Sequence, residues 1–557
     1  MNRKDPWRPL YHPSVSPKID IDQYKNILDV FDQAVSRYSH RKAFTNFGHT
    51  VTYSQLSEKV DQFAAFLQQE LKLKKGDRIA IQMPNLLQYP VAIFGALKAG
   101  LIIVNTNPLY TASEMKHQFK DSGAKCIVIL KNYAHLLESI IKETKIESVI
   151  LTEIGDALSF PKNLLINFVI KYVKKMVPAY HLPQAYDFNQ ALEIGRLASF
   201  QKVEMNIVDT AFLQYTGGTT GVSKGAILTH RNIIANMLQI CNWMRPKLKE
   251  GEEIALTPLP LYHIFSLTVN CLAFMRYGAQ NILITNPRDI PAFIKEMKKS
   301  NFTVMSGVNT LFNALMNHPD FTSIDFKRVK ISVAGAMALQ KAVSERWEKM
   351  TQTKIVEGYG LTETSPVACC NPIDGTDRVG TIGLPVPETW IKFVDDEGNE
   401  VTHNEPGEIC VYGPQVMKGY WERPDETAQV IDKDGWLRTG DIGVLDEKNY
   451  VKIVDRKKDM ILVSGFNVYP NEVEDAIATH PGVLEVAAIG VPDIHSGEVV
   501  KVVVVKKDPS LTEQMVIDHA KQSLTNYKVP KIVEFRTELP KTNVGKILRR
   551  ALRTPNA

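Results

Sequence analysis

The sequence has no apolar run long enough to cross a bilayer. Its first residues, MNRKDPWRPLYHPSVSPKID, contain no apolar core of the kind that a secretory signal carries. The six cysteines form no CxxC pair and stand mostly in apolar runs, which favours buried, reduced thiols over a disulfide framework. Together these absences predict a cytoplasmic protein.

An excess of charge of one sign is missing as well. The chain has 66 basic and 61 acidic residues, and a net charge of +5 over 557 residues does not indicate nucleic-acid binding. With 44% hydrophobic and 23% charged residues, the composition is typical of a globular protein. A chain of this length exceeds one ordinary hydrophobic core, so we expect at least two domains.

The patterning of apolar residues indicates the fold class. Residues 53–71 have helical spacing, whereas 77–83 and 124–130 have the composition of buried strands. This alternation, which continues to about residue 205, predicts α/β layers around a largely parallel sheet. From about residue 390, short strands and turns indicate a β-rich part. The pattern of the last hundred residues predicts a compact α+β domain, with the boundary at the charged stretch 454–460.

One loop has a composition that no helix or strand interior would have. In YTGGTTGVSKG, residues 215–225, four glycines let backbone N–H groups approach an anion, and threonine hydroxyls and Lys224 add donors. We expect a strand at 211–215 before it and a helix at 229–244 after it, whose N-terminus would face the same anion. The loop differs from Walker A, since Lys224 follows Ser223 instead of glycine. A phosphate cradle is favoured over a flexible connector.

Four further stretches occur in the order and spacing of the acyl-adenylate-forming enzymes. They are EGYGLTET (357–364), GWLRTGDIG (435–443), DRKKDMILVSGFNVYPNEVE (455–474) and PKTNVGKILRR (540–550). From about residue 25 to its end the chain resembles that superfamily. MPNLLQYPVA, PLYHIF, TNPRDIP and GVNTLFNAL make it similar to the bacterial long-chain fatty acid–CoA ligases of β-oxidation. One position departs from the pattern: Arg438 stands where those enzymes usually have histidine.

The resemblance implies a fold and a reaction. The fold would be α/β: a large N-terminal domain of layered α/β subdomains with a β-rich subdomain (1–454), a hinge (455–460) and a small mobile α+β domain (461–557). The reaction would join a long-chain fatty acid to CoA in two halves. ATP first converts the acid to acyl-AMP and pyrophosphate, with Mg²⁺ as cofactor, and CoA then displaces AMP. The product would feed fatty acid degradation and drive uptake by trapping.

The resemblance also implies how ATP is held. The loop would bind the β- and γ-phosphates, Thr362 the α-phosphate and Glu363 the Mg²⁺, because this ion shares its shell with phosphates and water and needs few carboxylates. Tyr359 would stack on adenine, while Asp441 and Arg456 would contact the ribose. The implied nucleotide-binding residues are Tyr215, Thr216, Gly217, Gly218, Thr219, Thr220, Gly221, Lys224, Gly335, Ala336, Met337, Glu357, Gly358, Tyr359, Gly360, Asp441 and Arg456.

Catalysis would depend on Lys546, which in the family bridges the reacting carboxylate and the α-phosphate, where negative charge develops. His263 would position or gate the acyl carboxylate, since a carboxylate nucleophile needs no general base; the alternative is a core histidine. Lys458 would be the hinge residue, and Gly465 would approach the pantetheine arm of CoA. For the acyl tunnel we expect a lining from the stretch 307–315, by Val308, Leu311 and Phe312.

The segment 163–177 has two interpretations. Its apolar residues follow helical spacing on one face, and three lysines, Lys171, Lys174 and Lys175, cluster on another. It is either a basic amphipathic helix on an anionic membrane or a surface helix whose apolar side faces the core. Because a long-chain substrate comes from a membrane, the resemblance favours peripheral association with the inner face of the cell membrane.

Other functions remain open at this point. The shape of the acyl pocket distinguishes a fatty acid ligase from an aryl-CoA ligase or luciferase. A single sequence gives little indication of the specificity of that pocket. A peptide-synthetase adenylation domain is less favoured, because the chain stops soon after Lys546. A fatty-acid binding or uptake protein without catalysis would not need Lys224, Glu363 and Asp441. The sequence does not decide the oligomeric state, for which a homodimer is one alternative.

Overall fold

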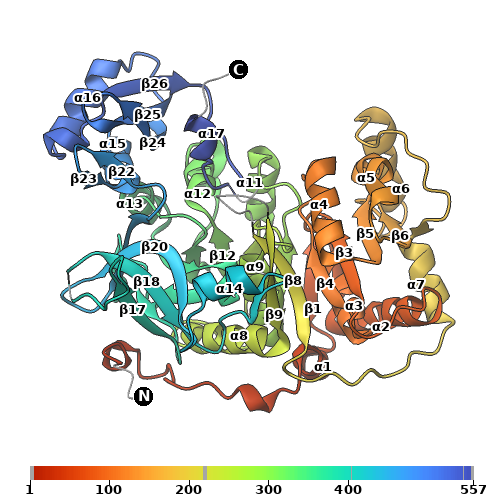
Figure 1. Cartoon of the computed structure of the whole chain (residues 1–557). Coiled ribbons are helices and arrows are strands. Elements are labelled where there is room, and N and C mark those ends of the chain that lie inside the picture. The colour runs from red at the N-terminus through yellow and green to blue at the C-terminus, as the bar shows by residue number, and fades with distance from the viewer. Residues whose placement is uncertain (1–4, 217–222, 403, 543–544, 554–557) are drawn as a thin grey trace.

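Four β-sheets organise the computed structural model, which describes residues 5–216, 223–402, 404–542 and 545–553 (Figure 1). The first sheet is parallel from β14 through β1, with antiparallel strands at both edges. Its order is β16 (Leu384–Pro385), β15 (Val367–Cys370), β14 (Ile355–Gly360), β13 (Ile331–Ala334), β12 (Val304–Gly307), β10 (Ile254–Thr257), β11 (Gln280–Leu283), β1 (Lys42–Asn46) and β2 (His49–Thr52).

The second sheet is also mainly parallel and carries the glycine-rich loop. Its order is β19 (Gly419–Tyr420), β9 (Lys224–Thr229), β8 (Thr210–Thr216), β4 (Ile102–Asn105), β3 (Arg78–Gln82), β5 (Cys126–Leu130), β6 (Ser148–Thr152) and β7 (Tyr186–Asp187). The central strands are buried along almost their whole length, as continuous apolar runs such as CIVIL require. The predicted α/β layering is therefore confirmed.

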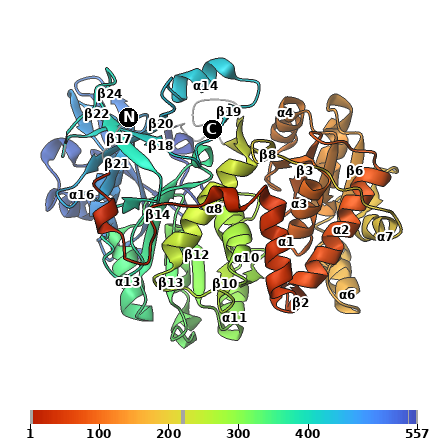
Figure 2. The ribbon, with the colours of Figure 1, turned by 90° about the horizontal axis from the view of Figure 1, so that it is seen from below.

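Helices cover these two sheets and pack between them (Figures 1 and 2). The longest, α2, begins at a capping box in which Thr52 accepts the N–H of Gln55 and the Gln55 side chain accepts the N–H of Thr52. The helices of this part are α1 (Ile27–Tyr38), α2 (Tyr53–Gln69), α3 (Gln88–Lys98), α4 (Ala112–Ser122), α5 (Ala134–Ile140), α7 (Phe188–Arg196), α8 (His230–Met244), α9 (Ile264–Ser266), the π-helical η6 (Leu267–Ala273), α10 (Phe274–Arg276), α11 (Ile290–Lys299), α12 (Asn309–Met316) and α13 (Lys341–Thr351).

The β-rich part and the C-terminal domain each have their own sheet. The first contains β17 (Trp390–Val394), β18 (Gly407–Tyr412), β20 (Leu437–Leu445) and β21 (Val451–Arg456). A separate hydrophobic core begins at Ile461. It is built on β22 (Ile461–Val463), β23 (Phe466–Val468), β24 (Val483–Asp493), β25 (Gly497–Lys506) and β26 (Ile532–Arg536), with α15 (Pro470–Ala478), α16 (Glu513–Lys521) and α17 (Arg550–Arg553). The exact limits of the domains stay a prediction.

The glycine-rich loop joins two antiparallel strands, so the expected order of strand, loop and helix is wrong. Thr216 at the end of β8 pairs with Lys224 at the start of β9, and α8 begins only at His230. The helix N-terminus is thus one full strand away from the loop. It cannot contribute to an anion site there, because β9 carries the chain away from the loop before the helix starts.

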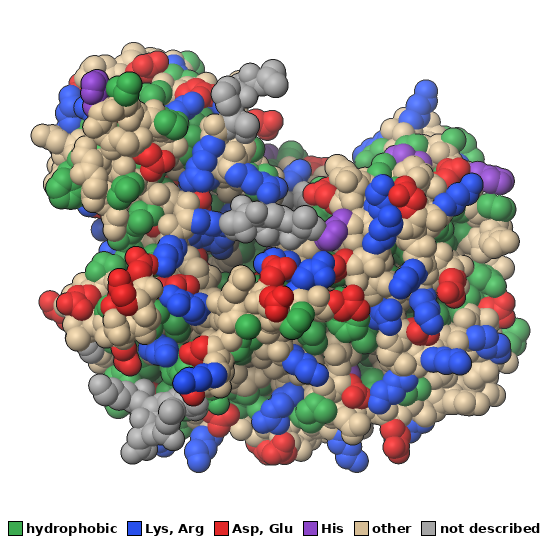
Figure 3. Space-filling view, in the orientation of Figure 1, with side chains coloured by type: hydrophobic (Ala, Val, Ile, Leu, Met, Phe, Trp, Pro, Cys, Tyr) green, Lys and Arg blue, Asp and Glu red, His purple; other side chains and the backbone are tan. Residues whose placement is uncertain are grey.

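The segment 163–177 forms α6 (Lys162–Phe168) and a π-helical turn, η5 (Val169–Val173). The interpretation that places its apolar side in the core is wrong, because Leu165, Phe168 and Val173 are 62%, 56% and 65% exposed. Within the described residues, no helix combines the length and the apolar character needed to span a membrane. Elsewhere, on the face that Figure 3 shows, Lys and Arg side chains are interspersed with Asp and Glu.

Candidate active site

A cavity of about 950 Å³ lies where the C-terminal ends of strands from both large sheets meet the C-terminal domain. Parallel strands that end at one edge leave such a crevice, and ligands bind there in open α/β sheets. Lys546 and the segment around it close the cavity from the C-terminal side. Residues distant in sequence are thereby brought together around it: Lys224, His263, Tyr359, Thr362, Glu363, Arg456, Lys458 and Lys546.

At one side of the cavity, Lys224 and Glu363 are linked through Tyr420. Lys224 forms an ion pair with Glu426 of α14 (Pro424–Val430), and its ammonium lies 5.1 Å from the centre of the Tyr420 ring. The Tyr420 hydroxyl donates to Glu363 Oε1 at 2.7 Å. The predicted loop residues Gly217, Gly218, Thr219, Thr220 and Gly221 lie outside the described residues. Sequence reasoning missed Tyr420 and Glu426, which follow a turn and carry no local signal.

Tyr215 and Thr216, at the end of β8, both line the cavity. The Tyr215 hydroxyl donates to Asp121 Oδ2 at 2.6 Å, and Asp121 also pairs with Arg423 at 2.6 Å. This arrangement fixes the edge of the sheet against α4, because Asp121 belongs to that helix. The Tyr215 ring also packs closely on Gly225, where a Cβ would lie 3.1 Å from two ring atoms. The tyrosine therefore holds the base of the loop in place.

Beside the cavity, Asp441 joins β14 to the β-rich sheet. Its Oδ2 accepts the Tyr359 hydroxyl at 2.7 Å, and its Oδ1 lies 3.3 Å from Arg456 Nε. Gly335, Ala336, Gly358 and Gly360 also line the cavity. Met337 and Glu357 do not: Met337 packs on the core, and the Glu357 carboxylate accepts the backbone N–H of Leu339.

Arg438, the departure from the family pattern, makes an ion pair instead of facing the cavity. Its guanidinium donates through Nε and Nη2 to Glu408 Oε2, at 3.1 and 2.8 Å. The other oxygen of Glu408 accepts the backbone N–H of Gly440 at 3.1 Å. The pair thus holds the part of β20 that precedes Asp441, and the sequence alone did not reveal the partner.

Burial shifts the pKa values of Lys546 and His263, which both line the cavity. Burial, followed by repulsion from Arg456, lowers the pKa of Lys546 to about 7, although Asp441 opposes the shift. Burial and the nearby Lys546 lower the pKa of His263 to about 4. His263 also caps α9, because its Nδ1 accepts the N–H of Phe265 at 3.4 Å. A neutral imidazole in this position orients groups and carries no charge at neutral pH.

The two residues assigned to domain movement lie in different surroundings. Lys458 follows β21 and lines the cavity, and burial lowers its pKa to about 8. Gly465 stands in the turn between β22 and β23 with a φ of +83°, a conformation that favours glycine. Within the described part of the chain, and apart from its two chain neighbours, no atom lies within 4 Å of a Cβ built on Gly465, and the residue is not part of the cavity.

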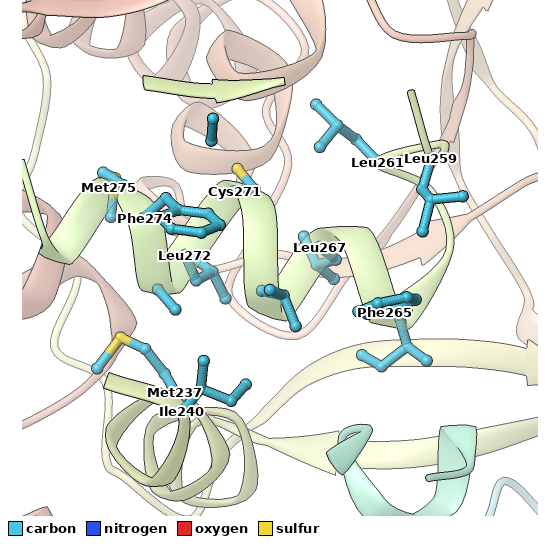
Figure 4. Close-up of a cluster of buried hydrophobic side chains, with 14 of the residues drawn as sticks. Met237, Ile240, Leu259, Leu261, Phe265, Leu267, Cys271, Leu272, Phe274 and Met275 are labelled. Carbon is cyan, nitrogen blue, oxygen red and sulfur yellow. The ribbon is translucent and has the colours of Figure 1, made fainter. Parts of the chain in front are cut away.

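The cavity continues as an apolar chamber between the helices and the first sheet. Figure 4 shows part of this region, with Phe265 and Phe274 on one helical run and Ile240 of α8 on a neighbouring helix. The apolar lining includes Ile240, Trp243, Met244, Phe265, Val269 and Phe274.

The structure places the expected tunnel residues elsewhere. Val308, Leu311 and Phe312 are absent from the residues that line the cavity. Phe312 packs edge-on against Trp347 with ring centres 4.8 Å apart. A Cβ on Gly545 would meet Val308 and Thr310, and the Thr310 hydroxyl donates to the Gly545 carbonyl at 3.1 Å. This stretch therefore supports the loop that carries Lys546, and does not line a tunnel.

Comparison with known proteins identifies relatives over almost the whole chain. Residues 31–421 match the model of the AMP-binding enzyme family, and residues 472–546 match that of the AMP-binding enzyme C-terminal domain. The chain is 57% identical over 550 residues to the long-chain-fatty-acid–CoA ligase of Escherichia coli O157:H7, covering 99% of this chain and 98% of that one. It is 38% identical to the protein of the same name from Bacillus subtilis strain 168, with 99% and 98% covered.

A solved structure is similar as well. The anthranilate CoA ligase AuaEII, in complex with anthranoyl-AMP, superimposes with a TM-score of 0.85 at 25% identity, covering 96% of this chain and 98% of that chain.

The lowered pKa of Lys546 predicts a pH-dependent cost in stability. Between about pH 7 and the ordinary lysine value, the unfolded chain binds a proton that the folded chain does not, so the free energy of unfolding rises with pH across this window. Lys546→Met should therefore be more stable than the wild type, by ~1.4 kcal/mol for each unit of pKa shift. The difference should be largest at and below pH 7 and should vanish toward pH 10.

Chemical denaturation of both proteins from pH 6 to 10 measures this. Lys531→Met, at an exposed lysine of the same domain, is the matched control and should show no pH-dependent gain. A stability difference that is flat with pH would contradict the assignment.

Proposed function

The chain belongs to the family of AMP-binding enzymes, and on that premise we propose that it is a long-chain fatty acid–CoA ligase. One observation carries this proposal: a half-buried lysine, Lys546, shares one cavity with Lys224 and Glu363 on one side and an apolar chamber on the other. A triphosphate suits the charged side, and an acyl chain suits the chamber.

The reaction has two halves because a carboxylate is a poor electrophile. In the first, a carboxylate oxygen of the fatty acid attacks the α-phosphorus of ATP, and the bond to pyrophosphate breaks. The resulting acyl-AMP is a mixed anhydride with a good leaving group. In the second, the thiol sulfur of CoA attacks the acyl carbon, the thiol proton is released, and AMP leaves with the electrons of the broken bond.

Lys224 and Glu363 hold the phosphates and the metal in this proposal. Lys224 leaves Glu426 and pairs with the β- and γ-phosphates when ATP binds, because a triphosphate carries more negative charge than one carboxylate. Glu363 suits Mg²⁺: Tyr420 occupies its Oε1, and among the described residues no donor bonds Oε2. The described residues contain no cluster of three metal-binding side chains, which fits an ion that takes most of its ligands from phosphates and water. Bound Mg²⁺ would neutralise phosphate charge.

Asp441 and Arg456 hold the ribose, and Tyr359 packs on the adenine. A buried carboxylate acts only as an acceptor, so Asp441 pairs well with two vicinal hydroxyl donors. Thr362 donates to the α-phosphate from the turn that follows β14. Tyr359, Thr362 and Arg456 line the cavity, and Asp441, which does not line it, is bonded to Tyr359 and Arg456. These positions support the proposed roles.

Lys546 stabilises the negative charge that develops between the carboxylate and the α-phosphate. Its side chain is half-buried in the cavity, so a cation there is partly shielded from solvent and stabilises the transition state. The approach of two anions favours the protonated amine, which offsets the lowering of its pKa by burial and by Arg456. His263, neutral at this pH, positions the acyl carboxylate.

The second half-reaction needs a different arrangement of the C-terminal domain. Gly465 stands away from the cavity while Lys546 is in it. A rotation at Lys458 would withdraw Lys546 and bring Gly465 to the entrance, where the lack of a side chain leaves room for pantetheine.

We further propose that α6 and η5 contact the membrane from which the substrate comes. Leu165, Phe168 and Val173 are exposed, and Lys171, Lys174 and Lys175 supply positive charge beside them. Such a pairing suits an anionic bilayer surface. The protein would then lie on the inner face of the cell membrane.

The substrate class is tested by CoA-dependent AMP formation from ATP and Mg²⁺ with saturated fatty acids of increasing length. We expect the highest kcat/KM for long chains, because each methylene buried in the chamber contributes about 0.8 kcal/mol. A maximum with benzoate or other aromatic acids would instead identify an aryl-CoA ligase.

The role of Lys546 is tested by separating the two half-reactions. Lys546→Ala should slow acyl-AMP formation by roughly 10²–10³-fold, as loss of one transition-state donor does. It should still convert supplied acyl-AMP and CoA to the thioester. Pyrophosphate release and thioester formation are measured separately, with Lys531→Ala as control. Equal loss of both halves in a folded variant would overturn this division of roles.

The membrane contact is tested by flotation with anionic and neutral vesicles. The wild type should float with anionic vesicles, and the Lys171→Glu/Lys174→Glu/Lys175→Glu variant should lose most of this binding. The matched control reverses the charge of three exposed lysines outside α6 and η5: Lys247→Glu/Lys249→Glu/Lys327→Glu. If the variant at Lys171, Lys174 and Lys175 binds anionic vesicles as the wild type does, this segment is not the membrane contact.

A further inference from the structure

The N-terminal segment before α1 lies outside the part of the chain that matches the AMP-binding enzyme family, which begins at residue 31. We call residues 7–16 the strap. Figure 2 shows the N-terminal segment running beneath α8 on its way to α1. Trp7 and Val15 are buried, so the strap is packed and does not hang free.

Specific hydrogen bonds fasten the strap at three places. Trp7 Nε1 donates to the Asn449 carbonyl at 2.8 Å. The Tyr11 hydroxyl donates to the Pro385 carbonyl at 2.7 Å. Ser16 and Asn242 of α8 exchange two hydrogen bonds, at 3.1 and 2.6 Å. A segment with this many fixed partners has a defined position against α8.

The strap holds one residue of the apolar chamber, Trp243. The Tyr11 ring meets the Trp243 ring edge-on, with centres 5.3 Å apart and planes at 84°. Trp243 Nε1 donates to the Asn371 carbonyl at 3.0 Å. The indole is therefore fixed by a hydrogen bond and by an aromatic contact, and its orientation is well defined.

Trp243 lies on the side of the chamber that is away from Gly360, because its partner Asn371 donates its backbone N–H to Glu357, three residues before Gly360 on β14. The chamber follows β13 from Gly335, just after its end, back to Ile331, a length of roughly 13 Å at the rise of a strand. The antiparallel strand β15 runs the same way, away from Gly360, and leads to Asn371 and the lining residue Ile373. Trp243 is bonded to that part of the chain.

From these contacts we infer that Trp243 forms the end wall of the acyl chamber and that Tyr11, on the strap, positions it. The pair then sets the longest acyl chain that binds without strain. This inference rests on the proposed function, since it concerns the selectivity of that same cavity. Trp243 would touch the methyl end of the substrate, and Tyr11 would act only through Trp243.

The experiment measures kcat and KM for saturated fatty acids from short to very long in the full-length protein. Trp243→Ala should raise kcat/KM for acids longer than the wild-type optimum, relative to that optimum, by at least about tenfold, the effect of a methylene-sized change in a hydrophobic pocket. The change in kcat/KM should come from KM, with kcat nearly unchanged. Tyr11→Ala should shift the ratio in the same direction but less, and Tyr11→Phe, which keeps the ring, should restore the wild-type ratio.

Leu10→Ala, on the strap next to Tyr11, is the matched control and should leave the ratio unchanged. Trp243→Phe keeps an aromatic ring at this position and should give an intermediate change in the same kcat/KM ratio. It replaces Trp243→Ala as the test if that variant fails to fold. If folded Trp243 and Tyr11 variants lower the activity with all acids equally, the inference is overturned. If the wild type releases no AMP with any fatty acid, the proposed function fails, and this outcome is distinct.

Discussion

The buried carboxylate of Asp441 is the contact on which the geometry of the site depends. It receives the hydroxyl of Tyr359 from the first sheet and pairs with Arg456 on the adjacent strand of the β-rich sheet. Glu408 and Arg438 fix the residues of β20 just before it. Asp441 is almost completely buried, so losing Arg456 would remove the charge that compensates it, and losing Tyr359 would remove a hydrogen bond. The two contacts therefore hold the two sheets in one relation to each other.

The same carboxylate is outnumbered by cations. Arg456, Lys458 and Lys546 all lie near it, and their mutual repulsion in a buried site adds to the lowering of the pKa values of both lysines. Such an arrangement is unfavourable by itself and favourable once an anion enters. The positive charge of the cavity thus suits a bound nucleotide and lowers the stability of the protein without one, as expected where stability is exchanged for function.

Sequence patterns predicted the elements well and the contacts between them poorly. Runs such as CIVIL and the helical spacing of 53–71 have one structural solution, so β5 and α2 were expected. The strand β9 was missed because KGAILT follows a glycine-rich loop and pairs back on β8. The motifs located Lys546 and Asp441 by resemblance. Tyr420, Glu426 and the Arg438–Glu408 pair depend on tertiary contacts, and no local spacing indicates them.

The apolar residues show most clearly why sequence patterns do not predict which side chains line the cavity. An apolar side chain that lines a chamber and one that fills a core have the same composition and the same periodicity. Phe312, expected in a tunnel, packs on Trp347, whereas Trp243, within an unremarkable helical pattern, lines the cavity. The difference lies in how α8, η6 and the strap pack together. The charged residues of the cavity stand at strand ends and on the C-terminal domain, while the chamber lies between helices and the first sheet. Acyl selectivity can therefore change through helix packing while the geometry at Lys546 and Asp441 stays the same.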